Sequence, residues 1–231
     1  LFVARLSSPL VIGVGNGEHF LASDATALLD HTKKVIYLDD YEVARICKKD
    51  VKIHNIKKAI LVQREAELLD YDAEKALLGD FPHFMLKEIH EQARAITDTI
   101  RGRVDLETGD VSLEDLPLAP GDTPERITLI GCGTSAYSAL IGKFLIEGIA
   151  RVPVEVDYGS EYRYRQPLVA PNSAVLGITQ SGETADTLAA MDEARRRGSR
   201  VWSIVNAIGS QAQRVSDGHI AMRAGPEIGV C

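Results

Sequence analysis

The stretch that decides the fold reads Ile127-Thr128-Leu129-Ile130-Gly131-Cys132-Gly133-Thr134-Ser135-Ala136. An apolar strand is followed at once by a glycine-rich turn, and a helical pattern then extends from 135 to 150. A strand that passes directly into a helix is the first half of a βαβ unit, in which the helix connects two parallel strands. The stretch therefore predicts an α/β fold built on a parallel sheet.

The same alternation continues toward the end of the sequence. Helices are expected at 184–197 and 210–215, and strands at 154–156, 174–178, 201–205 and 219–222. Strands that alternate with helices form parallel sheets covered on both faces. We expect residues 125–231 to form one nearly complete, doubly wound domain.

The first 71 residues are rich in predicted strands instead. Short apolar or alternating runs lie at 9–13, 19–22, 35–38, 42–46, 51–53 and 59–62. A short helix capped by Asp24 is expected at 25–29. Because these strands lack an obvious layer of helices, we interpret residues 1–71 as the C-terminal part of a larger β-rich domain.

A helix and a linker separate the two regions. The helix is indicated by apolar residues at helical spacing, namely Met85, Ile89, Ala93, Ile96 and Ile100. About five turns are expected, with an end near Gly102. Glycine, proline and acidic residues between 104 and 124 predict a loop or linker.

Composition narrows the class of protein. The 231 residues are 45% apolar and 26% charged, which is typical of a soluble globular protein. The net charge of −7 gives no general attraction for nucleic acid or for an anionic membrane. No apolar run approaches the ~20 residues that a membrane-spanning helix needs. We expect neither nucleic acid nor a membrane as a partner.

Cysteines and histidines suggest no metal site. Cys47, Cys132 and Cys231 lie far apart, and an odd number without a disulfide framework favours the reducing cytoplasm. His83 and His90 fall two turns apart on the predicted helix, but no carboxylate or cysteine completes a ligand set. We expect surface or packing roles for both.

Two strand-to-helix turns could carry chemistry. Residues 131–136 satisfy the G-x-G-x-x-G/A dinucleotide fingerprint, and Glu155 and Asp157 follow about 20 residues later. A nicotinamide-dependent enzyme is therefore one alternative. The second turn, Thr179-Gln180-Ser181-Gly182-Glu183-Thr184, crowds three hydroxyls and a glycine at the start of a helix. Free N–H groups, the helix dipole and hydroxyls together suit a phosphate dianion.

The plainer alternative is that Ser181 or Thr184 only caps the helix. Neither turn holds the lysine of a P-loop, and Thr179 replaces the first glycine of a serine-hydrolase elbow. A third turn, 207–210, could add Ser210. Because the carboxyl ends of parallel strands share one edge, we expect Thr134 and Ser135 to join this phosphate site.

The sequence resembles the glutamine–fructose-6-phosphate aminotransferase family. Segments similar to its first sugar isomerase (SIS) domain are 131–135, 161–164, 179–187 and 224–230. Segments similar to the end of its glutaminase domain are 8–13 and 20–24, and 84–92 is similar to its interdomain helix.

The resemblance implies a flavodoxin-like SIS domain at 125–231. It also implies a glutaminase portion of Ntn-hydrolase type at 1–71, with an interdomain helix and linker at 72–124. The family converts fructose 6-phosphate and glutamine to glucosamine 6-phosphate and glutamate, without a dissociable cofactor or metal, and its SIS halves pair as homodimers. The implied substrate-binding residues are Thr134, Ser135, Thr179, Gln180, Ser181, Thr184 and Ser210.

The match to the family is partial. The sequence opens at Leu1 without the amino-terminal cysteine nucleophile of the family, and the family's glutamine-binding residues would lie upstream. Its isomerisation residues would follow Cys231. We therefore expect an internal fragment, inactive by itself, with no catalytic residue and with glutamine bound only in the full-length protein. A non-catalytic SIS regulator that binds sugar phosphates is the other alternative to this assignment.

Overall fold

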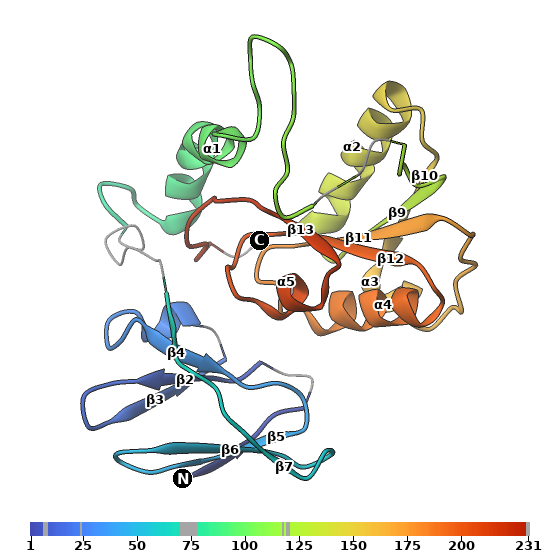
Figure 1. The fold of residues 1–231 in the computed structure, drawn as a ribbon. Coiled ribbons are helices and arrows are strands. Elements are labelled where there is room, and N and C mark those ends of the chain that lie inside the picture. Colours follow the sequence, from blue (N-terminus) through green and yellow to red (C-terminus); the bar gives the residue numbers. More distant parts are fainter. Residues whose placement is uncertain (7–8, 24, 70–77, 117, 119–120, 230–231) are drawn as a thin grey trace. The chain divides into compact units, whose positions relative to one another are not determined.

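A computed structural model describes residues 1–6, 9–23, 25–69, 78–116, 118 and 121–229. The chain divides into two compact units, Leu1–Leu77 and Leu78–Cys231 (Figure 1). The division that the sequence predicts after residue 71 falls among residues 70–77, outside the described residues. The predicted cap Asp24 also lies outside them.

The first unit consists of two antiparallel sheets. One has the strand order β1-β5-β6-β7 and the other has the order β3-β2-β4-β8. The strands are β1 (Phe2–Ala4), β2 (Val11–Val14), β3 (His19–Ala22), β4 (Lys34–Tyr37), β5 (Glu42–Ile46), β6 (Val51–Asn55), β7 (Ile60–Val62) and β8 (Glu67–Leu68). The sequence pattern missed β1 and β8. Both are short edge strands, and pairing with a neighbour rather than an internal pattern creates them.

The two sheets of the first unit share an apolar core. Ile36 and Leu38 from one sheet pack with Ala44 and Ile53 from the other. Val51 and Ile53 alternate with exposed Lys52, as a half-buried strand requires. The predicted short helix is a 3-10 helix, η1 (Ala25–Leu28).

The second unit is a parallel sheet of five strands with the order β10-β9-β11-β12-β13. Its strands are β9 (Arg126–Gly131), β10 (Val154–Tyr158), β11 (Ser173–Thr179), β12 (Arg200–Val205) and β13 (Gly218–Ala221). Every pair in this sheet is parallel. Counted along the chain the order is 2-1-3-4-5, which is the flavodoxin-like doubly wound order. The fold expected from the strand–turn–helix stretch is confirmed.

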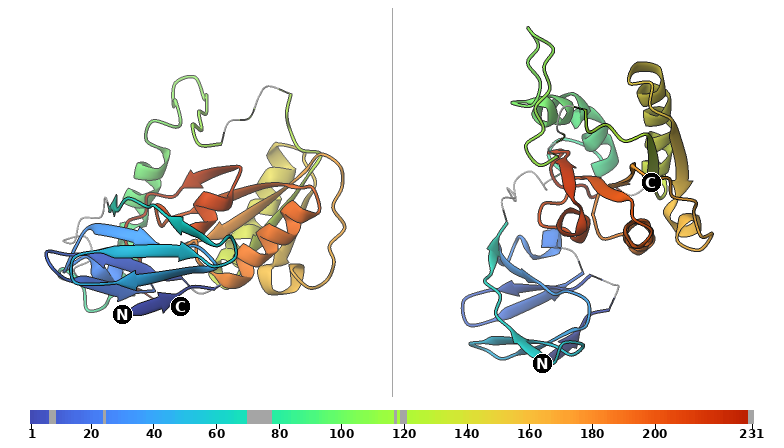
Figure 2. Two further views of the ribbon diagram at one scale, coloured as in Figure 1. Left: turned by 60° about the horizontal axis from the view of Figure 1, so that its bottom comes forward. Right: turned by 45° about the vertical axis from the view of Figure 1, so that its right-hand side comes forward.

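Helices cover both faces of this sheet (Figure 2). The helices α3 (Gly159–Tyr162), α4 (Ala185–Arg196) and α5 (Gln211–Val215) pack on one face around Met191 and Tyr162. The opposite face is covered by α2 (Thr134–Ile149) over β9 and β10. Beside α2, Leu113 and Leu116 of the predicted linker pack on Trp202. The end of the linker therefore belongs to the core, and His219 N–H donates to Asp115 O at 2.8 Å.

The long amphipathic helix predicted before the linker is α1 (Phe84–Ile100). His83 stands at its N-cap, where Nδ1 accepts a hydrogen bond from the N–H of Leu86 at 3.2 Å. His90 stacks on Phe81, with ring centroids 5.4 Å apart. Both histidines are exposed and have local contacts at α1, which agrees with the expected surface or packing roles.

The helix α2 packs on the sheet through its smallest residues. Ala136 and Ala139 are buried, and Gly142 lies against Leu129. Ile146 also packs against the sheet, whereas six large apolar side chains of α2 point outward and are 46–81% exposed; they are Tyr137, Leu140, Ile141, Phe144, Leu145 and Ile149. We call these six residues the α2 patch. In the described part of the chain, no helix has the length and apolar character needed to cross a membrane.

Candidate functional site

The first turn of the candidate site joins β9 to α2. Gly133 has a φ of +55° and stands at the N-cap of α2, so no side-chain hydrogen bond closes this helix end. The left-handed backbone at this position favours glycine. Thr134 is exposed and Ser135 is half-buried, and both lie in the first turn of α2. The open helix start faces the carboxyl edge of the sheet.

The second turn joins β11 to α4. Thr179 ends β11 and is 3% exposed; its hydroxyl accepts a hydrogen bond from the N–H of Gly182 at 3.2 Å and lies 3.5 Å from the hydroxyl of Thr184. Ser181 Oγ accepts from the N–H of Glu183 at 3.2 Å. These local bonds curl the turn so that hydroxyls gather in front of α4.

The capping alternative can be compared with this geometry. Thr184 occupies the N-cap of α4, but its side chain makes no cap hydrogen bond, and the partner of Ser181 lies ahead of the helix. The first N–H groups of any α-helix have no partner within the helix. The start of α4 therefore keeps the donors that an anion would use.

The third turn lies between β12 and α5, against the second turn. Ser210 stands at the N-cap of α5 and is 2% exposed, and its Oγ has no hydrogen-bond partner among the described residues. Gly182 has a φ of +68°, and a Cβ placed on it would lie 2.1 Å from Ser210 Oγ. Only glycine fits at this point of the second turn.

Side-chain and backbone contacts join the first turn and α3 to the start of α4. Cys132 Sγ in the first turn lies 3.6 Å from Thr187 Oγ1 in the first turn of α4. Arg163, which follows α3, forms an ion pair with Asp186 at 2.8 Å. Gly159 of α3 approaches the backbone of Asp186 so closely that an added Cβ would lie 3.0 Å from it. The sequence pattern did not predict α3, although the segment 161–164 was part of the family resemblance.

The residues that suggested a dinucleotide site are engaged elsewhere. Arg165 forms ion pairs with Asp157 at 2.6 Å and with Glu155 at 3.0 Å, and Arg126 lies 4.0 Å from Glu155. Burial raises the pKa of Asp157, and the positive charge of Arg165 opposes that rise. Both carboxylates that could bind a ribose hydroxyl therefore already have a cationic partner.

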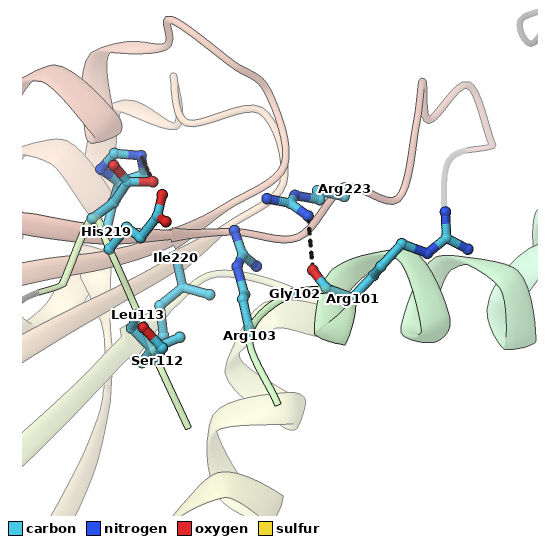
Figure 3. A pocket seen from close by; sticks show the side chains of 10 residues that line it. Arg101, Gly102, Arg103, Ser112, Leu113, His219, Ile220 and Arg223 are labelled. Carbon is cyan, nitrogen blue, oxygen red and sulfur yellow. Dashed lines mark hydrogen bonds and ion pairs between the residues drawn. The ribbon is translucent and has the colours of Figure 1, made fainter. Parts of the chain in front are cut away.

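A cavity of about 290 Å³ lies away from these turns, between the end of α1, the linker and β13 (Figure 3). Arg103 Nη1 donates to Ala221 O at 2.6 Å, and Arg223 Nη1 donates to Arg101 O at 3.2 Å. Burial and the nearby charge of Arg223 lower the pKa of Arg103. None of the residues that line the cavity belongs to the three turns. The sequence interpretation did not single out these arginines, because a lone Arg-Gly-Arg after a helix has no specific meaning.

Comparison with known proteins agrees with the fold. Residues 123–231 match the family model described as the SIS domain. The chain is 47% identical over 232 residues to the "Glutamine--fructose-6-phosphate aminotransferase [isomerizing]" of Chlorobaculum tepidum. It is 46% identical over 230 residues to the protein of that name from Thermus thermophilus. Both alignments include the whole chain and 38% of the relative.

A solved structure is similar as well. The C-terminal domain of glucosamine-fructose-6-phosphate aminotransferase from Francisella tularensis superposes with a TM-score of 0.60 and 36% identity, over 66% of this chain and 43% of that one. The fold and the family model define a SIS domain at residues 123–231. Over its full length, the chain is similar to the glutamine–fructose-6-phosphate aminotransferases, and it spans 38% of the length of those relatives.

Proposed function

We propose that this chain supplies the sugar-phosphate-binding turns of a glutamine–fructose-6-phosphate aminotransferase. In that reaction, fructose 6-phosphate and glutamine yield glucosamine 6-phosphate and glutamate, as a step of amino-sugar synthesis. The proposed substrate-binding residues are Thr134, Ser135, Thr179, Gln180, Ser181, Thr184 and Ser210. No catalytic residue and no cofactor is assigned to this part of the enzyme.

One observation carries the proposal. Three helices begin side by side at the carboxyl edge of the sheet, and none of their N-caps makes a side-chain cap hydrogen bond. In the second turn, the hydroxyls of Thr179 and Thr184 lie 3.5 Å apart in front of α4. Helix N–H groups together with neutral hydroxyls suit a phosphate dianion. In flavodoxin-like sheets this edge, at the switch point between the first and third strands, is where ligands bind.

Hydrogen bonds must supply most of the local binding energy, because residues 179–184 contain neither lysine nor arginine. A hydrogen bond to a charged group contributes roughly 1.5–3 kcal/mol. Loss of one such hydroxyl should weaken binding by about tenfold to a hundredfold, at 1.4 kcal/mol per factor of ten.

Ser181→Ala tests the assignment in the 231-residue chain. Calorimetric titration should show that fructose 6-phosphate binds about tenfold to a hundredfold more weakly to the variant, while the weak affinity for unphosphorylated fructose stays the same. Thr97→Ala is the matched control, since its hydroxyl is bonded to Ala93 O within α1, and it should bind like the wild type. An equal loss of affinity for both sugars would show that Ser181 has only a structural role.

Titration with NAD tests the dinucleotide alternative in the same way, and saturable binding of NAD alone would favour it.

The first unit fits a glutaminase portion of the same enzyme. Its two antiparallel sheets, which share one core, correspond to the sheet layers of an Ntn-type domain. The helical layers and the nucleophile of such a domain would come from other residues of the full-length protein. The similarity to the aminotransferases includes this unit, whereas a SIS regulator would not need it. We assign residues 1–71 to this portion, 72–124 to the interdomain helix and linker, and 125–231 to the first SIS domain. Glutamine would bind only in the full-length protein.

We also assign the chain a homodimeric state, with the α2 patch as the contact surface. At roughly 100 Å² of exposed area for each of its side chains, the patch amounts to roughly 600 Å², the upper end of what monomers display. Each partner in a stable complex buries about 800 Å².

A cytoplasmic location fits the two free cysteines of the described chain, Cys47 and Cys132.

A further inference from the structure

Asn206 lies directly after β12, at the carboxyl edge of the sheet, and is 5% exposed. Its backbone N–H donates to the carbonyl oxygen of Gln180 at 3.2 Å, inside the second turn. Its side chain binds a different segment. Nδ2 donates to Gly225 O at 2.6 Å, and Oδ1 accepts from the N–H of Ala224 at 2.9 Å. One buried residue therefore holds both the candidate phosphate turn and the chain that follows β13.

The partners of the amide group fix its orientation. An N–H partner requires the oxygen of the amide, and a carbonyl partner requires its nitrogen. The N–H of Ala224 and the carbonyl of Gly225 therefore determine where the oxygen and the nitrogen of the Asn206 amide lie. Aspartate has the same shape but cannot donate to Gly225, and alanine loses both bonds.

The residues after Asn206 support the same turn from behind. The N–H of Ala207 donates to Gln180 O at 3.0 Å, and the N–H of Ala212 donates to Gly182 O at 2.9 Å. The N–H of Gln211 donates to Glu183 Oε1 at 2.7 Å. These bonds occupy acceptors of the turn, so that its hydroxyls and the N–H groups of α4 remain on the side of the ligand.

The segment after β13 is itself anchored on α1. Glu88 Oε1 accepts hydrogen bonds from the N–H groups of Ile228 at 2.7 Å and Gly229 at 3.0 Å. The hydroxyl of Thr99 donates to the carbonyl oxygen of Met222. A continuous set of contacts thus leads from α1 through residues 222–229 to Asn206 and then to the phosphate turn.

We propose that Asn206 is a positioning residue for the sugar-phosphate site. By holding Ala224 and Gly225 it fixes residues 206–212, and these fix the geometry of Gln180–Thr184. Binding through several hydrogen bonds depends on the placement of each donor to a fraction of an ångström, so a loosened support weakens binding without removing any contact to the ligand. The inference rests on the proposed function, because it takes the second turn to be the phosphate site.

The first test needs no ligand. Amide hydrogen exchange, measured by NMR on the 231-residue chain, should be at least about tenfold faster in Asn206→Ala at Gly182, Glu183, Ala207 and Ala212, since local opening becomes easier. Ser199→Ala is the matched control. Ser199 flanks the other end of β12, is 6% exposed and donates to Ser173 O at 3.2 Å, so its loss should leave exchange in the turn unchanged. Unchanged exchange at the turn in Asn206→Ala would overturn the proposal.

Asn206→Asp tests the donated bond in a side chain of the same shape. Its carboxylate keeps the bond from Ala224, loses the bond to Gly225 and sets a buried negative charge against that carbonyl oxygen, so exchange at the four amides should be at least as fast as in Asn206→Ala. Exchange as slow as in the wild type would show that the donated bond has no role in holding the turn.

The second test measures coupling. Asn206→Ala should weaken the binding of fructose 6-phosphate about fivefold to tenfold, within the range of residues that act without touching the ligand. In the double variant with Ser181→Ala the two effects should not add, because both act through one turn, whereas Ser199→Ala should leave affinity unchanged. Full additivity, or an unchanged affinity, would contradict the role of Asn206. A wild-type chain that binds fructose 6-phosphate no better than fructose would instead contradict the phosphate assignment itself.

Discussion

At the scale of single residues, the candidate site contains a glycine at which any added side chain would collide with a neighbouring turn. Gly182 combines a φ of +68° with a neighbour that would lie 2.1 Å from an added Cβ. Gly133 shares the positive φ, at +55°, but nothing lies within 4 Å of its added Cβ. Substitution of Gly133 therefore measures backbone strain alone, whereas substitution of Gly182 measures backbone strain together with a steric clash.

Gly182→Ala should therefore lower the free energy of unfolding more than Gly133→Ala does. We expect a loss of about 1–2 kcal/mol for Gly133→Ala from its backbone alone, and about 2–4 kcal/mol for Gly182→Ala, where overpacking against Ser210 is added. Urea unfolding monitored by fluorescence of Trp202, the single tryptophan of the sequence, reports on the second unit. Equal losses in the two variants would mean that Ser210 moves aside.

At the scale of elements, α3 shows how a one-turn helix can hold a site together. It lies between β10 and α4, and its side chain Tyr162, 2% exposed, packs in the core with Met191 and Val175. Burial raises the pKa of Tyr162 to about 12, against an ordinary value near 10. The buried phenol is therefore more easily kept neutral in the folded chain than in the unfolded one.

This difference makes stability fall at high pH. Because the folded-state pKa is the higher one, the contribution of Tyr162 is complete below about pH 10 and is lost as the pH rises toward 12. Two pKa units correspond to about 2–3 kcal/mol. Between pH 10 and pH 12 the wild type should lose about that much more stability in urea unfolding than Tyr162→Phe, which retains the other six tyrosines. Parallel stability curves for the two proteins would contradict this expectation.

At the scale of the whole molecule, the α2 patch gathers six exposed large apolar side chains on one helix. Its helix packs through alanine, glycine and Ile146, and it presents six other large side chains to solvent. Phe144→Glu places a charge in the middle of the patch, where Phe144 is 72% exposed, and should convert a dimer of the 231-residue chain into a monomer. Sedimentation velocity measures the change.

Leu106→Glu is the control for this experiment. Leu106 is 83% exposed in the linker, outside the patch, so the same change there should leave the association state as it is. A wild-type chain that sediments as a monomer at all concentrations would mean that another part of a longer protein, and not a second copy, covers the patch.

The sequence by itself determined the elements of the second unit and their order along the chain, apart from the one-turn helix α3. Strand–turn–helix patterns with abrupt glycine turns are local, so 131–136 and 179–184 could be recognised and assigned to one edge of a parallel sheet. The same local reasoning placed α1 and most strands of the first unit. The site residues could be named because hydroxyls at a helix start are visible in the sequence, while their role stays a prediction.

The tertiary structure decided what no local pattern contains. The orphaned hydroxyl of Ser210 against Gly182, the bonds of Asn206 and the pairing of Arg165 with two carboxylates join residues that are far apart in the chain. Six large side chains of α2 have a core-like composition and yet face solvent, while the sheet receives Ala136, Ala139, Gly142 and Ile146 of the same helix, because the close approach of the helix to Leu129 favours small residues there. Sequence periodicity shows that a helix has apolar residues, but only packing decides which of them meet a neighbour.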